Sequence, residues 1–325
     1  MDRSKKQRWL AVLFLLLFSG VRLYSGDEGE GLATLPDSGS ESNPSPRPFR
    51  AHAQLVLVNV SVIDVYDRFV TGLQKENFQV YEDKKPQQIE EFSKEDVPIS
   101  VGILFDASGS MAGKMEKARM AVSQFFRTAN PADEFFLISF NNRPNKISDF
   151  TQDLGTLQDK LNFTETKGQT ALLDAVYLGL HEMRNAQHSR KVLLIFSDGG
   201  DNHSRYTPRD IKGAVKEADV QIYAIGIYEP NGFNQTPEEL AGPSLLNEIV
   251  EMTGGRQFAV ENLNNLPAVA SKVGREMRQL YVLGYSPTNK QNDGKWRKIQ
   301  VKLIPPKGIL PLQLFSKSGY YAPHY

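Results

Sequence analysis

Residues 101–111 read Val-Gly-Ile-Leu-Phe-Asp-Ala-Ser-Gly-Ser-Met. The apolar run before Asp106 lacks polar alternation, which is typical of a strand buried on both faces of a sheet. Asp106 should therefore lie at the carboxyl end of that strand, the edge at which open parallel sheets bind ligands. Ser108 and Ser110 follow at alternate positions, and Gly109 allows a tight loop. Oxygen ligands of this kind favour a hard cation, Mg²⁺ first and Mn²⁺ or Ca²⁺ next.

Two later stretches can bring further oxygen ligands to the same edge. Residues 167–175 read Lys-Gly-Gln-Thr-Ala-Leu-Leu-Asp-Ala, and Thr170 is a natural N-cap for a helix that starts there. Residues 192–200 read Val-Leu-Leu-Ile-Phe-Ser-Asp-Gly-Gly, a second buried-type strand that ends in a carboxylate, Asp198. Because parallel strands share one carboxyl edge, we expect these groups to meet.

The centre of the chain alternates strands and helices, which predicts an α/β, Rossmann-like doubly wound sheet, mostly parallel, with helices on both faces. The expected helices span 115–129, 170–186, 208–219, 245–253 and 266–280, and the further strands span 134–140, 190–197, 220–228 and 256–260.

At these residues the chain resembles a known family. Asp-x-Ser-x-Ser, a later Thr that opens a helix, and a strand ending in Ser-Asp-Gly are similar to the metal-ion-dependent adhesion site (MIDAS) of von Willebrand factor A (VWA) domains. The resemblance covers residues 98–280 and implies Mg²⁺ ligation by Asp106, Ser108, Ser110, Thr170 and Asp198. Gln169 departs from the second Gly that the family often carries before the Thr, but it leaves every ligand type in place.

The resemblance also implies a function. In the family, a carboxylate from a protein or peptide partner replaces a water on the cation, and the last helix can slide when the site changes state. Residues 266–280 are the candidate for that helix here. We expect the metal loop to be exposed. Asp106→Ala should therefore abolish partner binding with little loss of fold.

Length and composition limit the number of domains and the class of partner. The 325 residues allow about two domains. The formal net charge is zero, so the charge balance does not point to nucleic acid as a partner.

The flanks of residues 98–280 alternate like antiparallel strands. Residues 51–97 carry three strand patterns, at 55–64, 78–81 and 88–92, with a turn at 82–86 between the last two. Residues 281–325 carry three more, at 281–285, 297–303 and 312–315, with a turn at 292–294. One β-sandwich built from both flanks, with the metal domain inserted into it, is our interpretation, and two small independent domains are the alternative.

The amino terminus predicts export. A basic start followed by a short apolar run makes residues 1–26 either a cleaved signal peptide or an uncleaved membrane anchor, and the latter is the only membrane contact expected. Residues 27–50, rich in Gly, Ser, Pro and acid, are expected to be a disordered linker. The absence of Cys in an exported chain favours a bacterial protein, secreted, periplasmic or in the cell envelope. The whole resembles an acidobacterial-type VWA-related group.

Charged residues around the predicted site have two possible roles each. Lys114, Arg143, Lys167 and Arg205 are either scattered surface charges or a rim that steers an acidic partner. Asp174 is expected to cap its helix or form a salt bridge rather than bind the metal. Asp201 and Asn202 are expected at a loop tip and not among the ligands.

The function predicted from the sequence is therefore an exported, non-enzymatic adhesion or protein-binding module. The alternative is an envelope scaffold whose metal only stabilises the loops. A metal-dependent phosphohydrolase is disfavoured, because aspartyl-phosphate phosphatases need a second acid where Ser108 stands.

Overall fold

The computed structural model describes residues 55–228, 236–306, 308 and 310–324. Everything described below belongs to one compact unit, residues 52–325. The predicted export segment 1–26 and linker 27–50 lie outside the described residues. Within the described part of the chain, no helix has the length and apolarity that a membrane crossing requires.

A six-stranded sheet forms the centre of the fold, in the order β10-β9-β8-β5-β6-β7. All neighbouring pairs are parallel except β6 and β7. This confirms the doubly wound, mostly parallel sheet that the sequence predicted. The strands are β5 (Ile99–Asp106), β6 (Glu134–Phe140), β7 (Pro144–Thr151), β8 (Arg190–Ser197), β9 (Gln221–Ile227) and β10 (Gln257–Val260).

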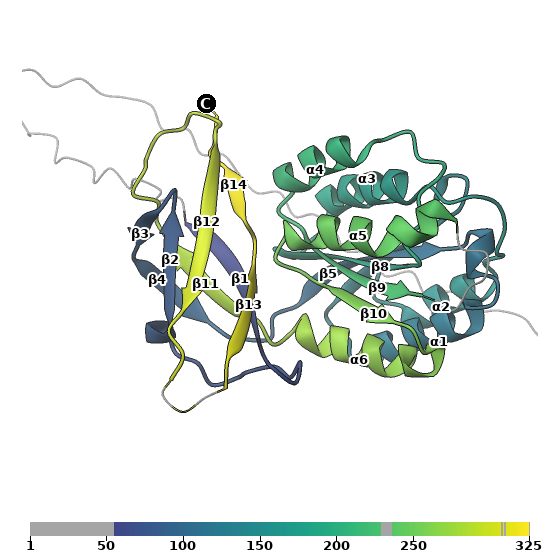
Figure 1. Ribbon diagram of the computed structural model, residues 1–325, viewed down its shortest axis with the longest axis horizontal. Helices are drawn as coiled ribbons and strands as arrows, with labels where there is room; N and C mark the ends of the chain where they lie inside the picture. The colour runs from purple at the N-terminus through teal and green to yellow at the C-terminus, as the bar shows by residue number, and fades with distance from the viewer. Residues whose placement is uncertain (1–54, 229–235, 307, 309, 325) are drawn as a thin grey trace, which may run out of the picture. The chain divides into compact units, whose positions relative to one another are not determined.

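Helices cover both faces of this sheet (Figure 1). One apolar core lies under α1 (Met115–Phe126), α2 (Leu154–Asn162) and α6 (Leu266–Glu276). The other lies under α3 (Leu172–Glu182), α4 (Pro208–Glu217) and α5 (Pro237–Glu251). Because the central strands face a core on each side, their residues are apolar without alternation.

Two antiparallel four-stranded sheets are built from strands on both sides of the central domain. Their orders are β13-β1-β11-β4 and β14-β12-β2-β3, and they share one apolar core. Each sheet therefore mixes strands that precede residue 98 with strands that follow residue 280. The strands are β1 (Val56–Asp64), β2 (Phe78–Glu82), β3 (Lys85–Gln87), β4 (Ile89–Ser93), β11 (Tyr281–Tyr285), β12 (Trp296–Leu303), β13 (Leu312–Ser316) and β14 (Gly319–Tyr321).

The turn expected at 82–86 is shorter than predicted. Asp83 and Lys84 have φ values of 46° and 68°, which make a tight two-residue turn between β2 and β3. The strand pattern at 88–92 is β4, and it pairs with β11 in the other sheet instead of returning beside β2. The strand β3, which lies between this turn and β4, was not predicted, because it has only three residues.

Contacts join the antiparallel sheets to the central domain at α6. The carboxylate of Glu276 accepts hydrogen bonds from Arg256 Nε at 2.8 and 2.9 Å and from Ser61 Oγ of β1 at 3.2 Å. Arg256 Nη1 also pairs with Asp67 at 2.5 Å, and Lys272 pairs with the same carboxylate. The carboxyl end of α6 is thus tied to β1 and to the loop that follows it.

Candidate metal centre

The candidate site lies at the carboxyl edge of the parallel sheet, between β5 and β8, where the strand order reverses. Phe105 of β5 is in register with Phe196 of β8, so Asp106 and Ser197 end neighbouring strands side by side. Asp198 follows directly. The edge therefore brings together two of the predicted ligands from segments about ninety positions apart in sequence.

Asp106 is held firmly. Its Oδ1 accepts a hydrogen bond from the Ser108 backbone N–H at 2.9 Å, and its Oδ2 accepts one from Ser197 Oγ at 2.5 Å. The side chain is completely buried, so the exposure expected for Asp106 was wrong, although Gly109 in the same loop is exposed. The reason is that Ala107 and Ser108 continue the buried path of β5 for two more residues. Burial, and then the charge of Asp198, raises the pKa of Asp106 to about 7.

Asp198 faces a buried cation of the chain itself. Lys114, which immediately precedes α1, places its Nζ 3.2 Å from Asp198 Oδ2. Only 6% of Lys114 is exposed. The expected place of Lys114 among surface charges or on the partner-facing rim was therefore wrong, because its ammonium group reaches inward. Asp198 Oδ1 also accepts a longer hydrogen bond from the Gly200 N–H, at 3.3 Å.

Ser108 and Ser110 present their hydroxyls as a pair. Ser108 is the N-cap residue of a short 3-10 turn at Gly109–Met111, Ser110 lies within that turn, and their Oγ atoms are 3.1 Å apart. Neighbouring ligands in an octahedron with Mg²⁺–O distances of about 2.0–2.1 Å are roughly 3 Å apart. The spacing of the two hydroxyls therefore fits adjacent corners of such an octahedron.

The Thr170 loop is attached to the Asp106 loop through the backbone. Gly109 N–H donates to Gly168 O at 2.9 Å, and Lys167 N–H donates to Ala107 O at 2.9 Å. Gly168 has a φ of +78°, a conformation that favours glycine, and its neighbour Asn142 accepts from Gln169 N–H at 2.6 Å. Thr170 itself is buried, and the loop that carries it is fixed beside the serine loop.

The predicted helix cap at Thr170 was wrong. The helix α3 begins two residues later, its N-cap residue is Ala171, and that residue makes no side-chain cap. Asp201 supplies the cap instead, because its Oδ1 accepts from Leu172 N–H at 2.9 Å and from Leu173 N–H at 3.4 Å. Burial raises the pKa of Asp201. Asp201 lies in the loop after β8, so the sequence next to α3 contains no signal for this cap.

The loop after Asp198 has a larger structural role than its sequence suggested. Asn202 Oδ1 accepts from Thr170 N–H at 2.9 Å, while the N–H groups of Asn202 and His203 donate to Thr170 O at 3.0 Å. Asp174 forms the predicted salt bridge, with its Oδ2 at 3.0 Å from Arg205 Nε. These contacts join all three ligand-bearing loops into one unit.

The donor set fits a hard divalent cation. Two carboxylates, those of Asp106 and Asp198, and the hydroxyls of Ser108, Ser110 and Thr170 offer oxygen only. Among the described residues, no group of three or more His, Cys, Asp or Glu side chains is arranged to hold a metal. A centre built from two carboxylates and three hydroxyls does not depend on such a group. Metal binding by these five residues stays a prediction.

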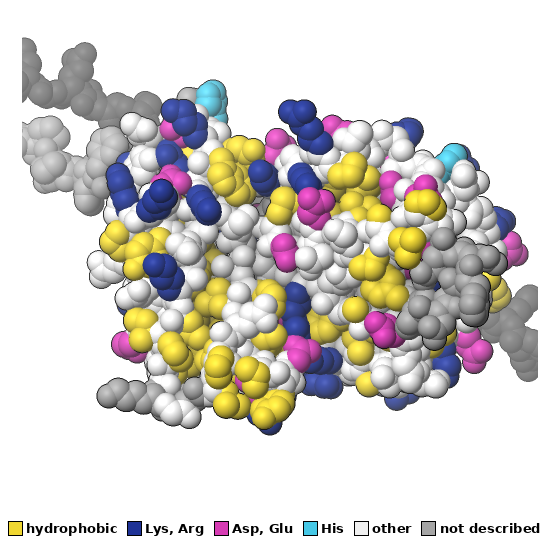
Figure 2. All heavy atoms as spheres, viewed as in Figure 1, with side chains coloured by type: hydrophobic (Ala, Val, Ile, Leu, Met, Phe, Trp, Pro, Cys, Tyr) yellow, Lys and Arg dark blue, Asp and Glu magenta, His cyan; other side chains and the backbone are white. Residues whose placement is uncertain are grey.

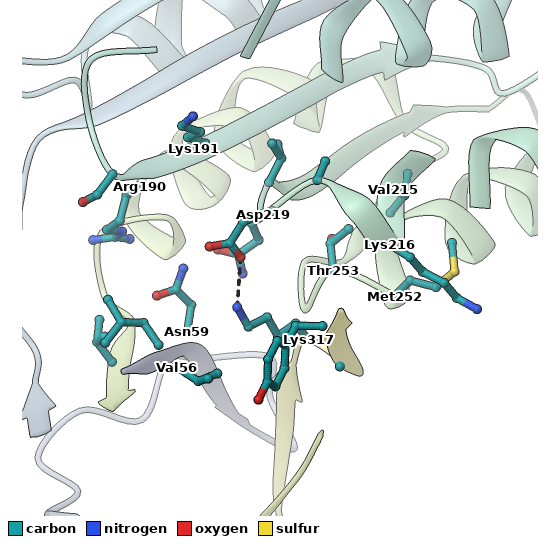
Figure 3. Close-up of a pocket in the computed structure, with 18 of the residues that line it drawn as sticks. Val56, Asn59, Arg190, Lys191, Val215, Lys216, Asp219, Met252, Thr253 and Lys317 are labelled. Atoms are coloured by element: carbon teal, nitrogen blue, oxygen red, sulfur yellow. Dashed lines mark hydrogen bonds and ion pairs between the residues drawn. The ribbon is translucent and has the colours of Figure 1, made fainter. Parts of the chain in front are cut away.

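A separate hollow of about 460 Å³ lies at the start of β8 and β9, the opposite edge of the same sheet (Figure 3). Its walls carry charges of both signs, with Arg190 and Lys191 among the basic residues and Asp219 among the acidic ones. Lys317 from the antiparallel sheets pairs with Asp219 across it at 2.9 Å. None of the five predicted ligands lines this hollow, so it is distinct from the candidate metal centre.

Comparisons with known proteins give a family model and several solved structures. Curated protein sequences contain no match. Solved structures that resemble the chain include BatB from Bacteroides thetaiotaomicron, at 19% identity over 55% of this chain and 98% of that one, with a TM-score of 0.45. A von Willebrand factor type A protein from Catenulispora acidiphila has 14% identity over 84% and 64% of the two chains, with a TM-score of 0.49. The vWF domain of the type V pili tip protein Mfa5 from Porphyromonas gingivalis has 15% identity over 55% and 95%, with a TM-score of 0.44.

The family assignment rests on a sequence match. Residues 101–200 match the family model of the von Willebrand factor type A domain. They run from β5 through β8 to the loop after it, and so include every predicted metal ligand. The chain therefore carries a von Willebrand factor type A domain.

Proposed function

We propose that the protein is an exported binding module that holds Mg²⁺ at the carboxyl edge of its parallel sheet and uses the ion to bind a carboxylate of a protein partner. The observation that carries the proposal is the pairing of Ser108 and Ser110 hydroxyls, 3.1 Å apart, beside the buried carboxylates of Asp106 and Asp198. Lys114 pairs with Asp198, whereas Asp106 accepts hydrogen bonds from Ser108 and Ser197, so a cation beside Asp106 would favour the charged form of its carboxylate.

Each residue of the proposed centre has a definite task. Asp106, Ser108, Ser110, Thr170 and Asp198 would hold the ion, with Mn²⁺ or Ca²⁺ as possible substitutes. Ser197 fixes the direction of the Asp106 carboxylate through a 2.5 Å hydrogen bond. Gly109 and Gly168 keep the serine and threonine loops together. When bound, the ion supplies a concentrated positive charge to which a partner carboxylate can attach.

We propose binding rather than catalysis. An aspartyl-phosphate mechanism needs a general acid two residues after the nucleophile, and Ser108 occupies that position with its hydroxyl against Ser110. An envelope scaffold is the second candidate, favoured by one observation. Lys114 already pairs with Asp198, so the chain has a cation of its own with which to stabilise the loops.

Calorimetric titration with Mg²⁺ tests the metal centre, using wild type, Ser110→Ala and Ser189→Ala. Ser110 is partly exposed, so its hydroxyl can be removed without opening the core, while Ser189 is an exposed serine at the opposite end of β8. We expect Ser110→Ala to weaken Mg²⁺ binding by about tenfold, the loss of one good ligand contact of about 1.4 kcal/mol. Ser189→Ala should bind as wild type does.

The same proteins separate the two candidate functions when an aspartate-containing peptide is titrated in Mg²⁺ and in EDTA. A binding module should hold the peptide in Mg²⁺ only, and a peptide that lacks the carboxylate should fail to bind. A scaffold should show higher thermal stability in Mg²⁺ without any peptide binding. Equal Mg²⁺ affinity of Ser110→Ala and wild type would contradict the proposed centre.

A further inference from the structure

A basic groove adjoins the Thr170 side of the metal centre. It measures about 690 Å³ and is walled by three elements: the loop between β6 and β7, the outer face of α3, and the loop between β8 and α4. We define it by its main side chains, which are Arg143, Tyr177, His181, His203, Arg205 and Tyr206.

The groove is continuous with the loops of the metal centre. Asn142 lines it and also accepts the hydrogen bond from Gln169, the residue before Thr170. His203 lines it and donates its backbone N–H to Thr170 O. A ligand that reached from the metal centre over Thr170 would therefore enter this groove directly.

The exposed ionisable side chains of the basic groove include two arginines and two histidines. The acid that lines it, Asp174, is only 4% exposed. Its Oδ1 accepts from the N–H groups of Arg205 and Tyr206 at 2.9 and 3.1 Å, and its Oδ2 accepts from Arg205 Nε at 3.0 Å. Asp174 is thus occupied inside the wall, and the groove presents positive charge to its occupant.

Arg205 is prepared for an anion. Asp174 fixes the guanidinium through Nε, while the side chain as a whole remains 83% exposed. The two Nη groups therefore stay available, on an arginine whose orientation has already been restricted. Arginine binds carboxylates through pairs of parallel N–H bonds, and restricting it in advance lowers the entropic cost of binding.

Two stacked aromatic rings form a wall of the groove. Tyr177 of α3 and Tyr206 have ring centroids 4.1 Å apart at an interplanar angle of 23°. Tyr177 is 41% exposed, so the pair offers a flat surface beside the arginines. A positively charged groove with one aromatic wall suits an extended acidic peptide.

We propose that the basic groove binds a second carboxylate of the same partner segment whose first carboxylate attaches to the metal. The proposal rests on the function proposed above. It assigns Arg143 and Arg205 to selection of partners with two acidic residues a few positions apart, and it makes Asp174 a positioning residue for Arg205. Lys114 and Lys167 take no part, since Lys114 is buried and Lys167 lies outside this groove.

Fluorescence anisotropy with labelled Gly/Ser peptides tests the proposal. One peptide carries a single aspartate, and a series adds a second aspartate two to six residues away. In Mg²⁺, wild type should bind the best two-aspartate peptide at least about tenfold more tightly, as expected for one charge-assisted contact. Arg143→Gln and Arg205→Gln should remove that advantage and change the affinity for the single-aspartate peptide by much less than that tenfold.

The control is Lys298→Gln, an exposed basic residue of β12. Basic side chains also gather over the antiparallel sheets (Figure 2), so this variant measures the effect of lost charge outside the groove. It should keep the full advantage of the second aspartate. Asp174→Asn, which retains every arginine, should lose part of the advantage if positioning of Arg205 matters.

The outcomes separate the two proposals. Arginine variants that retain the advantage of the second aspartate, or a wild type that shows no advantage, would overturn the groove while Mg²⁺-dependent binding of the single-aspartate peptide stood. Single-aspartate binding that EDTA leaves unchanged would overturn the proposed metal function. Arg205-dependent binding of a heparin oligosaccharide in EDTA, tighter than that of any peptide, would replace the acidic peptide with a general polyanion as the occupant.

Discussion

At the scale of single residues, the site depends on how its two buried carboxylates are compensated. Asp106 relies on hydrogen bonds from Ser108 and Ser197, whereas Asp198 relies on the ammonium group of Lys114. Burial, and then the charge of Asp198, raises the pKa of Asp106. A divalent ion at this position would reduce the repulsion between the two carboxylates. Removal of Lys114 should therefore strengthen metal binding.

Lys114→Met is therefore expected to lower stability in EDTA and to strengthen Mg²⁺ binding. Loss of the partner of a buried acid costs about 3–5 kcal/mol, because Asp198 is left in a poorly solvated position without a cation. Mg²⁺ should restore most of that loss. Urea denaturation with and without Mg²⁺ measures both effects. A variant whose stability in EDTA equals that of wild type would show that the Lys114 pair contributes nothing.

Gly102 has no side chain because the sheet leaves no room for one. A Cβ at this position in β5 would lie 2.6 Å from Leu193 Cδ2 and closer still to the Phe136 ring. We expect Gly102→Ala to destabilise the protein by about 1–3 kcal/mol through overpacking. Thermal unfolding of this variant beside Gly213→Ala, where a Cβ meets no atom within 4 Å, isolates the effect. Equal losses in the two variants would contradict it.

At the scale of secondary structure, the predictable elements were those with uniform burial or strong helical periodicity. The strands β5 and β8 were predictable because both faces are apolar, and α4 because Pro208 opens it. The strand β7 was missed, since an edge strand with Lys146 and Asp149 on it lacks the apolar signal. The first half of α5 was missed because Gly242 and Pro243 interrupt its pattern.

Part of the site was predictable for the same reason. Asp106 and Asp198 lie at one edge of the sheet, as expected, because Asp106 ends β5, Asp198 directly follows β8, and parallel strands share an edge. The inward course of Lys114 and the cap supplied by Asp201 were not predictable. Both depend on the path of a loop relative to a distant segment, 84 positions away for Lys114 and Asp198.

The helix α3 provides a test at this scale, because its cap, Asp201, directly precedes Asn202, which is hydrogen-bonded to Thr170. We expect Asp201→Ala to cost about 1 kcal/mol of stability, the usual value of an N-cap. It should also weaken Mg²⁺ binding severalfold, since the loop that holds Thr170 loses its anchor. Thr207→Ala, which removes the cap of α4, should cost similar stability and leave Mg²⁺ affinity intact. Calorimetry measures the Mg²⁺ affinity of both variants, and urea denaturation measures their stability. Equal losses of Mg²⁺ affinity in the two variants would refute the connection between the α3 cap and Thr170.

At the scale of the whole molecule, α6 connects the central domain to the antiparallel sheets. Glu276 is buried, and its carboxylate is shared between Arg256 and Ser61, while Arg256 and Lys272 both reach Asp67. Burial raises the pKa of Glu276, although Arg256 and Ser61 act in the opposite direction. This network lies on the helix that, by family resemblance, is the candidate for a helix that can slide.

Arg256→Met should break the network and cost about 3–5 kcal/mol at neutral pH, because the Glu276 carboxylate loses its partner. The pKa of Glu276 should then rise further, so the native state would keep a proton that the unfolded chain releases near its ordinary pKa. Stability of the variant should therefore increase as the pH falls from 7 toward 5, more steeply than in wild type. Urea denaturation at both pH values measures this, and a variant curve parallel to that of wild type would argue against it.

The most direct measurement of the metal centre is anomalous diffraction from a crystal grown or soaked in Mn²⁺. We expect a single strong peak bounded by the oxygens of Asp106, Ser108, Ser110, Thr170 and Asp198, directly or through water, with Lys114 Nζ displaced from Asp198. A map without a peak there, at saturating Mn²⁺ and with the Lys114–Asp198 pair intact, would contradict the central claim.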